Sequence, residues 1–117
     1  MIGLTSGVRV WARACPTDLR LGFAGLAGLV QQEMGRELVS GELFLFVSRR
    51  RTSAKILHWD GTGLCLYSKR LAGRRRFAAL WERAERGQVR LTMAELALFL
   101  EGAEVSRRRA SRLSIIR

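Results

Sequence analysis

The stretch GELFLFVSRRRTSAKILHWDGTGLCLYSKRL, residues 41–71, contains three apolar segments separated by polar punctuation. Residues 41–48, 54–59 and 64–71 are rich in apolar and aromatic side chains, a composition typical of strands. Asp60-Gly61 favours a hairpin between the last two segments, with a type I′ turn that needs positive φ at both central residues. We therefore predict an antiparallel meander of three strands.

A meander would bring two clusters of cations together. The first strand runs toward an arginine-rich loop and the third strand returns to the same end of the sheet. A charge run is often only a solvated surface, whereas two converging runs favour contact with phosphates. The candidate nucleic-acid-binding residues are Arg49, Arg50, Arg51, Lys55, Lys69, Arg70, Arg74, Arg75 and Arg76.

The charge of the whole chain points the same way. Among 117 residues, 21 are basic and 10 are acidic, which gives a net charge of +11. This excess predicts a polyanionic partner, with nucleic acid favoured over a membrane surface. Compositional bias toward arginine is the alternative explanation.

Hydrophobic residues make up 48% of the chain, which is typical of a folded domain rather than a disordered one.

Two elements are expected before the meander. VRVWARA, residues 8–14, alternates apolar residues with Arg9, Trp11 and Arg13, as a strand with one basic and aromatic face would. Residues 15–35 then have apolar residues at helical spacing, with Thr17 or Asp18 as the expected N-cap. Three glycines of this helix, Gly22, Gly25 and Gly28, predict that it packs closely on the sheet. A phosphate-binding glycine loop is the weaker alternative, because the spacing and the lysine of such loops are missing.

A second helix is expected in VRLTMAELALFLEGAEV, where Thr92 and Glu95 fit a capping box. The arginine-rich residues 106–117 lack a core-forming pattern and are expected to form a flexible basic tail after a single domain, residues 1–105. The predicted fold class is α+β, with a mostly antiparallel sheet that is covered on one face by two helices.

No catalytic arrangement is recognisable in the sequence. The aspartates Asp18 and Asp60 have expected structural roles in a cap and a turn, and His58 is a lone imidazole on a strand. A metal-dependent nuclease that combines Asp18, Asp60 and a glutamate is a remote alternative. We therefore expect no enzymatic activity and no metal or cofactor. The sequence has no long apolar run, so we expect a cytoplasmic protein without membrane contact.

The order of motifs resembles the TnpB-type accessory protein of insertion-sequence family sixty-six, which is the product of that transposon's second open reading frame. The resemblance covers about residues 2–104, and P-T-D-L-R and K-I-L-H-W-D-G followed by K-R-L are its most specific parts. This family is unrelated to the RNA-guided nuclease called TnpB. Beyond the cations above, the motif positions are Asp18, Arg20, Trp59, Asp60 and Gly61.

The resemblance implies a non-catalytic protein that assists a separate transposase, with DNA as the expected ligand. An adaptor that contacts the transposase and binds little DNA is the alternative. The sequence departs from the family pattern where RRRFAALWERAERGQ lacks the usual Trp-Pro pair, so a strand over residues 78–88 is expected to diverge.

Overall fold

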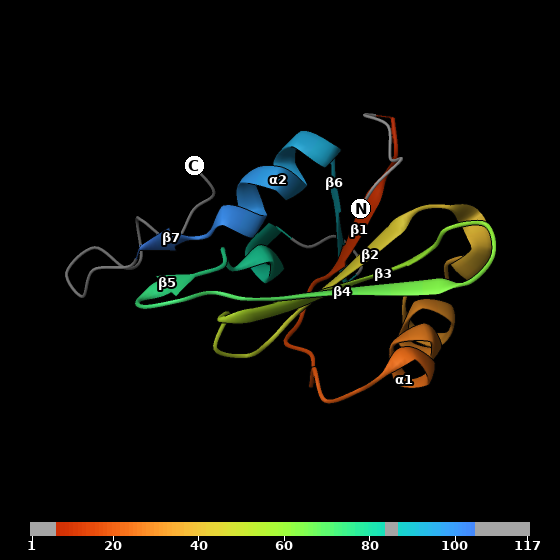
Figure 1. Ribbon diagram of the computed structural model, residues 1–117, viewed down its shortest axis with the longest axis horizontal. Coiled ribbons are helices and arrows are strands. Elements are labelled where there is room, and N and C mark those ends of the chain that lie inside the picture. The colour runs from red at the N-terminus through yellow and green to blue at the C-terminus, as the bar shows by residue number, and fades with distance from the viewer. Residues whose placement is uncertain (1–6, 84–86, 105–117) are drawn as a thin grey trace.

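The computed structural model describes residues 7–83 and 87–104 (Figure 1). Its main sheet has five strands in the order β4-β3-β2-β1-β6. A separate two-stranded sheet pairs β5 with β7. The strands are β1 (Val10–Arg13), β2 (Leu43–Val47), β3 (Ser53–Trp59), β4 (Leu64–Arg70), β5 (Arg75–Arg76), β6 (Gln88–Leu91) and β7 (Ala103–Glu104).

The predicted meander is confirmed, because β2 pairs antiparallel with β3 and β3 pairs antiparallel with β4. The predicted strand in residues 8–14 is also confirmed as β1, which is antiparallel to β6. β1 runs parallel to β2, and the long connection through the first helix makes this direction possible. The fold is therefore α+β with a mostly antiparallel sheet, as predicted.

The two helices lie on opposite faces of the sheet (Figure 1), so the prediction that both cover one face is wrong. Helix α1 (Phe23–Gly28) packs Leu26 with Phe44 of β2, whereas α2 (Met93–Glu101) packs Phe99 with Leu45 of the same strand. Every residue of β2 is buried. The uninterrupted apolar run of β2 is the pattern of a strand that is covered on both faces.

The first helix begins later than predicted, because neither Thr17 nor Asp18 caps it. Gly22 occupies the N-cap position and α1 begins at Phe23. The backbone N–H of Thr17 instead donates to the carbonyl of Val47 at 2.9 Å, which fixes this part of the chain to the end of β2. The helical path continues from α1 through a π-helical segment, η1 (Leu29–Glu33).

The close packing predicted from the three glycines of the first helix is also wrong. A Cβ atom added to Gly22 or Gly28 would meet nothing within 4 Å. The three atoms nearest to one added to Gly25 all belong to the side chain of Leu21, the closest at 2.8 Å, and none belongs to the sheet.

The hairpin between β3 and β4 is confirmed, but its predicted two-residue turn is wrong. Trp59 pairs with Leu64, so the connecting loop contains residues 60–63. Gly61 has a φ of +109°, whereas Asp60 does not share the positive φ that a type I′ turn requires. The side chain of Asp60 closes this longer loop by accepting the backbone N–H groups of Thr62 and Gly63.

Near the C-terminal end of the described chain, the predicted capping box of α2 is present. The Thr92 hydroxyl accepts the Glu95 N–H at 3.1 Å, and the Glu95 carboxylate accepts the Thr92 N–H at 2.9 Å. The strand expected over residues 78–88 is displaced, because Leu80–Arg83 form the short 3-10 helix η3 and the strand β6 begins only at Gln88. A second 3-10 helix, η2 (Leu38–Ser40), precedes β2. The predicted tail, 106–117, lies outside the described residues.

Candidate nucleic-acid interface

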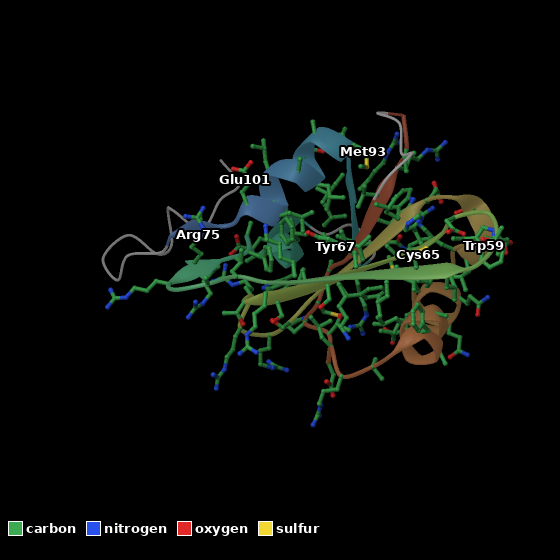
Figure 2. All side chains as sticks on the ribbon, viewed as in Figure 1. Trp59, Cys65, Tyr67, Arg75, Met93 and Glu101 are labelled. Carbon is green, nitrogen blue, oxygen red and sulfur yellow. The ribbon has the colours of Figure 1, made fainter. Side chains whose placement is uncertain are left out.

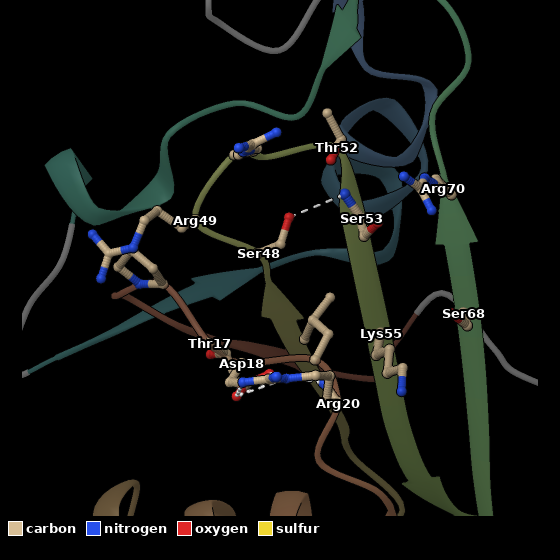
Figure 3. A pocket seen from close by; sticks show the side chains of 13 residues that line it. Thr17, Asp18, Arg20, Ser48, Arg49, Thr52, Ser53, Lys55, Ser68 and Arg70 are labelled. Carbon is tan, nitrogen blue, oxygen red and sulfur yellow. Dashed lines mark hydrogen bonds and ion pairs between the residues drawn. The ribbon is translucent and has the colours of Figure 1, made fainter.

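A cleft of about 1090 Å³ opens on the face of the sheet that carries α1 (Figure 3). Helix α1 covers only one end of this face, over Phe44 and Leu57. At the other end, the cleft is bounded by the loop 16–20, the loop 48–52 and the strands β3 and β4. Its cationic residues are Arg20, Arg49, Arg50, Lys55 and Arg70, and its only carboxylate among the described residues is Asp18.

The register of β3 and β4 determines which cations of the strands reach the cleft. Lys55 lies opposite Ser68, and Ser53 lies opposite Arg70. Side chains alternate between the two faces of a strand, so these residues share the face of α1. Hydroxyl groups and cations therefore alternate along the wall of the cleft, a combination that suits phosphate oxygens.

The loop 16–20 is held against the sheet by the half-buried side chain of Arg13 in β1. The Nη1 group of Arg13 donates to the Thr17 hydroxyl at 3.1 Å and to the Pro16 carbonyl at 3.2 Å. Its Nη2 group forms an ion pair with Glu33 at 2.8 Å, which links the loop to the end of the helical segment. Thr17 is buried, so this wall of the cleft is anchored by the protein interior.

Asp18 is engaged by Arg20 within the same loop. The Asp18 carboxylate accepts the backbone N–H of Arg20 at 3.0 Å and the Nη2 group of Arg20 at 2.8 Å. The side-chain hydrogen bond with Arg20, followed by the backbone one, lowers the pKa of Asp18 to about 2. Asp18 therefore stays ionised and paired at neutral pH.

The remaining predicted cations lie outside this cleft. Lys69 lies opposite Ala54, which packs in the core on the α2 face, so strand alternation puts Lys69 on that face too. Arg51 has a φ of +60°, and its Nη1 group donates to the Phe77 carbonyl at 3.2 Å. Arg74 is exposed in the turn that follows β4.

The side chains of Arg75 and Arg76 donate to backbone carbonyls. The guanidinium of Arg75 donates to the carbonyls of Glu101 and Gly102 at the end of α2, at 3.1 and 3.0 Å (Figure 2). Arg76 is half-buried and its Nη1 group donates to the Arg75 carbonyl. One of the predicted nucleic-acid-binding residues, Arg75, therefore binds the end of α2.

The motif residues Trp59, Asp60 and Gly61 lie at the opposite end of the sheet from the arginine loop, where β3 turns into β4 (Figure 2). Asp60 and Asp18 are therefore far apart along the sheet. Backbone hydrogen bonds from Thr62 and Gly63, followed by the Cys65 thiol, lower the pKa of Asp60 to about 2. Within residues 7–83 and 87–104, no three His, Cys, Asp or Glu side chains gather as a metal site would require.

Sequence reasoning did not anticipate the hydroxyl groups of the cleft or the position of Arg20 in it. The signal for Ser53 and Ser68 is their place in strand alternation, two residues from Lys55 and Arg70 respectively. No local pattern predicts that the loop of Arg20 folds back on β2, because the hydrogen bond from Thr17 to Val47 joins distant parts of the chain.

Comparison with known proteins agrees with the motifs. The family model described as IS66 Orf2 like protein matches residues 8–110. The chain belongs to the IS66 Orf2 like family. This confirms the predicted family, and the match extends beyond residue 104, where the sequence resemblance was expected to end.

Two relatives in Sinorhizobium fredii, strain NGR234, are themselves described as uncharacterized proteins. The protein y4hO is 38% identical over 104 residues, which cover 89% of this chain and 88% of the relative. The protein y4jC is 27% identical over 107 residues, which cover 92% and 89% of the two chains. No solved structure matches the chain significantly. No helix in the described ranges has the length and apolar character needed to cross a bilayer.

Proposed function

We propose that this protein is a non-catalytic accessory protein of insertion-sequence transposition that binds the DNA backbone through the cleft. Family membership supports the link to an insertion sequence. The observation that carries DNA binding is the set of cations in the cleft, Arg20, Arg49, Arg50, Lys55 and Arg70, which come from two loops and two strands.

The charge of the cleft favours phosphate over a neutral ligand. The carboxylate of Asp18 is already paired with Arg20, so the other cations have no acid partner among the described residues of the cleft. Cations together with hydroxyl groups contact phosphate and sugar, and such contacts position a protein without reading the sequence. DNA binding with modest sequence preference is the expected behaviour.

We propose a non-catalytic protein because its two aspartates are not arranged as an active site. Asp18 and Asp60 both accept hydrogen bonds from neighbouring groups and lie at opposite ends of the sheet. A two-metal nuclease needs carboxylates that converge on one site. We expect supercoiled plasmid to remain uncut in the presence of Mg²⁺ or Mn²⁺.

The transposase of the same element is the proposed protein partner. The strand β4 is an edge of the sheet, paired only with β3 among the described residues. An unpaired edge can accept an extended segment of another protein. This edge is the observation that favours the adaptor alternative, in which the transposase rather than DNA is the main ligand.

A gel-shift experiment separates the two functions. The protein is mixed with duplexes that carry the cognate transposon ends or a random sequence, with and without transposase, at several salt concentrations. Direct binding that weakens steeply with salt supports the proposed function. A shift that occurs only with transposase, and that does not depend on the cations of the cleft, would favour the adaptor.

A further inference from the structure

Among the described residues, Arg20 is the one cation of the cleft with a carboxylate partner. Its Nε group donates to Asp18 Oδ1 at 3.0 Å, and its Nη2 group donates to Oδ2 at 2.8 Å. Oδ1 also accepts the backbone N–H of Arg20 at 3.0 Å. A single carboxylate thus fixes both the backbone and the guanidinium of the same residue (Figure 3).

This ion pair does little for the packing of the protein. The side chain of Arg20 is 91% exposed and that of Asp18 is 52% exposed. Exposed ion pairs contribute little to stability, so the pair has no evident role in holding the fold. The carboxylate does, however, restrict a long side chain that no burial restrains.

The pairing leaves part of the Arg20 guanidinium available. Arginine has five N–H donors in a planar fork. The Nε hydrogen and one Nη2 hydrogen face Asp18, so both Nη1 hydrogens and the other Nη2 hydrogen have no partner in the described part of the chain. Planar pairs of N–H donors match the oxygens of a phosphate.

We infer that Asp18 positions Arg20 as a phosphate-contacting side chain, so that a DNA backbone phosphate is held between Arg20 on the loop and Lys55 and Arg70 on the strands. This inference rests on the proposed function. Asp18 itself touches no ligand and is a positioning residue. Orienting Arg20 before DNA arrives reduces the side-chain entropy that binding would otherwise cost.

Net charge alone predicts the opposite effect of Asp18 on DNA affinity. An acid beside a phosphate site repels the ligand, so removing it should strengthen binding if only net charge mattered. If Asp18 positions Arg20, removing the acid weakens binding even though the protein gains a positive charge. The sign of the change therefore distinguishes the two effects.

The test measures affinity for a random-sequence duplex by fluorescence anisotropy at several salt concentrations. Asp18→Asn keeps an oxygen that can accept the Arg20 N–H but removes the charge. Arg20→Gln removes the proposed contact. Glu37→Gln is the matched control, because Glu37 is exposed, lies outside the cleft and gives the same change in net charge.

Asp18→Asn should weaken binding by about three- to tenfold, as the loss of an oriented, charge-assisted contact would. Glu37→Gln should leave binding unchanged or slightly stronger. Arg20→Gln should lower the magnitude of the logarithmic salt slope by about 0.9, the value for one phosphate contact. The double variant should bind no more weakly than Arg20→Gln alone, because Asp18 acts through Arg20. Thermal melting should show that every variant remains folded, which separates a loss of binding from a loss of structure.

Three results would overturn the inference while the proposed function stands. In the first, Asp18→Asn binds the duplex as tightly as the wild type or more tightly. In the second, Arg20→Gln leaves the salt slope unchanged. In the third, the losses of affinity in the two single variants add up in the double variant. If the wild-type protein binds no duplex at any salt concentration, both the proposed function and this inference fail.

Discussion

Ser53 lies directly opposite Arg70 in the antiparallel pair of β3 and β4. This register sets Lys55 opposite Ser68, so Lys55 and Arg70 face the same cleft. The adjacent cation, Lys69, lies on the other face of the strand. A slip of one residue would exchange the faces of Lys69 and Arg70. The hairpin that fixes the register is therefore part of the proposed function.

The hairpin loop gives the first prediction. Gly61→Val should lower the free energy of unfolding by about 1–3 kcal/mol, because Gly61 has a φ of +109° that a β-branched residue adopts only with strain. Gly63→Ala is the matched control, since an added Cβ there meets nothing within 4 Å and its φ is not in the left-handed region. Equal melting temperatures for the two variants would contradict the loop geometry.

The acid limb of the stability curve gives the second prediction. Hydrogen bonds lower the pKa of Asp60 from 3.8 to about 2 in the folded protein. The folded state therefore binds fewer protons than the unfolded state, so this stabilisation is complete above pH 4 and is lost as the pH falls toward 2. Asp60→Asn should reduce the melting temperature at pH 7.

The difference in melting temperature between the wild type and Asp60→Asn should shrink between pH 4 and pH 2, because the protonated aspartic acid also loses its charged hydrogen bonds. A difference that is constant over this range would show that the charge of Asp60 does not stabilise the loop. The comparison isolates Asp60 from Asp18, which titrates in the same range in both proteins.

The first helix gives the third prediction. Gly28→Ala should stabilise the protein by about 0.5–1 kcal/mol, because alanine has the higher helix propensity. The site has open space for a Cβ atom. Gly25→Ala should gain less, since its Cβ would lie 2.8 Å from the Leu21 side chain. Urea unfolding of both variants measures this, and an equal gain would mean that Leu21 moves aside without cost.

Arg75 gives the fourth prediction. Arg75→Ala should destabilise the protein by about 1 kcal/mol, because its guanidinium satisfies carbonyls at the end of α2. Arg74→Ala removes the same charge from the exposed neighbouring position and should leave the melting temperature nearly unchanged. If the two variants melt alike, Arg75 does not stabilise the end of α2, and a role in DNA binding becomes the better explanation for it.

Local sequence patterns predicted the parts of this fold that depend on neighbouring residues. The capping box of Thr92 and Glu95 and the hairpin at Asp60-Gly61 are examples, because their hydrogen bonds join residues a few positions apart. The placement of the two helices depends on which face of β2 each one covers. The fully apolar sequence of β2 was the available signal for helices on both faces.

The cleft could be predicted only in part. The meander correctly predicted that Arg49 and Arg50 lie near Arg70, since all three line the cleft, whereas Arg51 lies outside it. The prediction did not recognise that Lys69 lies on the other face of the sheet from Lys55 and Arg70. The alternation of side chains along β4 would have indicated this difference. The contribution of Arg20 depends on a long-range hydrogen bond between Thr17 and Val47, which no local pattern indicates.

The central claim is that DNA binds the cleft rather than a diffuse basic surface, and a comparison of two double variants tests it most directly. Lys55→Gln with Arg70→Gln removes two charges inside the cleft, and Lys69→Gln with Arg74→Gln removes the same charges outside it. The first pair should lower the magnitude of the logarithmic salt slope for duplex binding by about 1.8 and weaken affinity strongly, while the second pair should leave the slope nearly unchanged. Equal effects of the two pairs, or an unchanged slope for both, would contradict the claim.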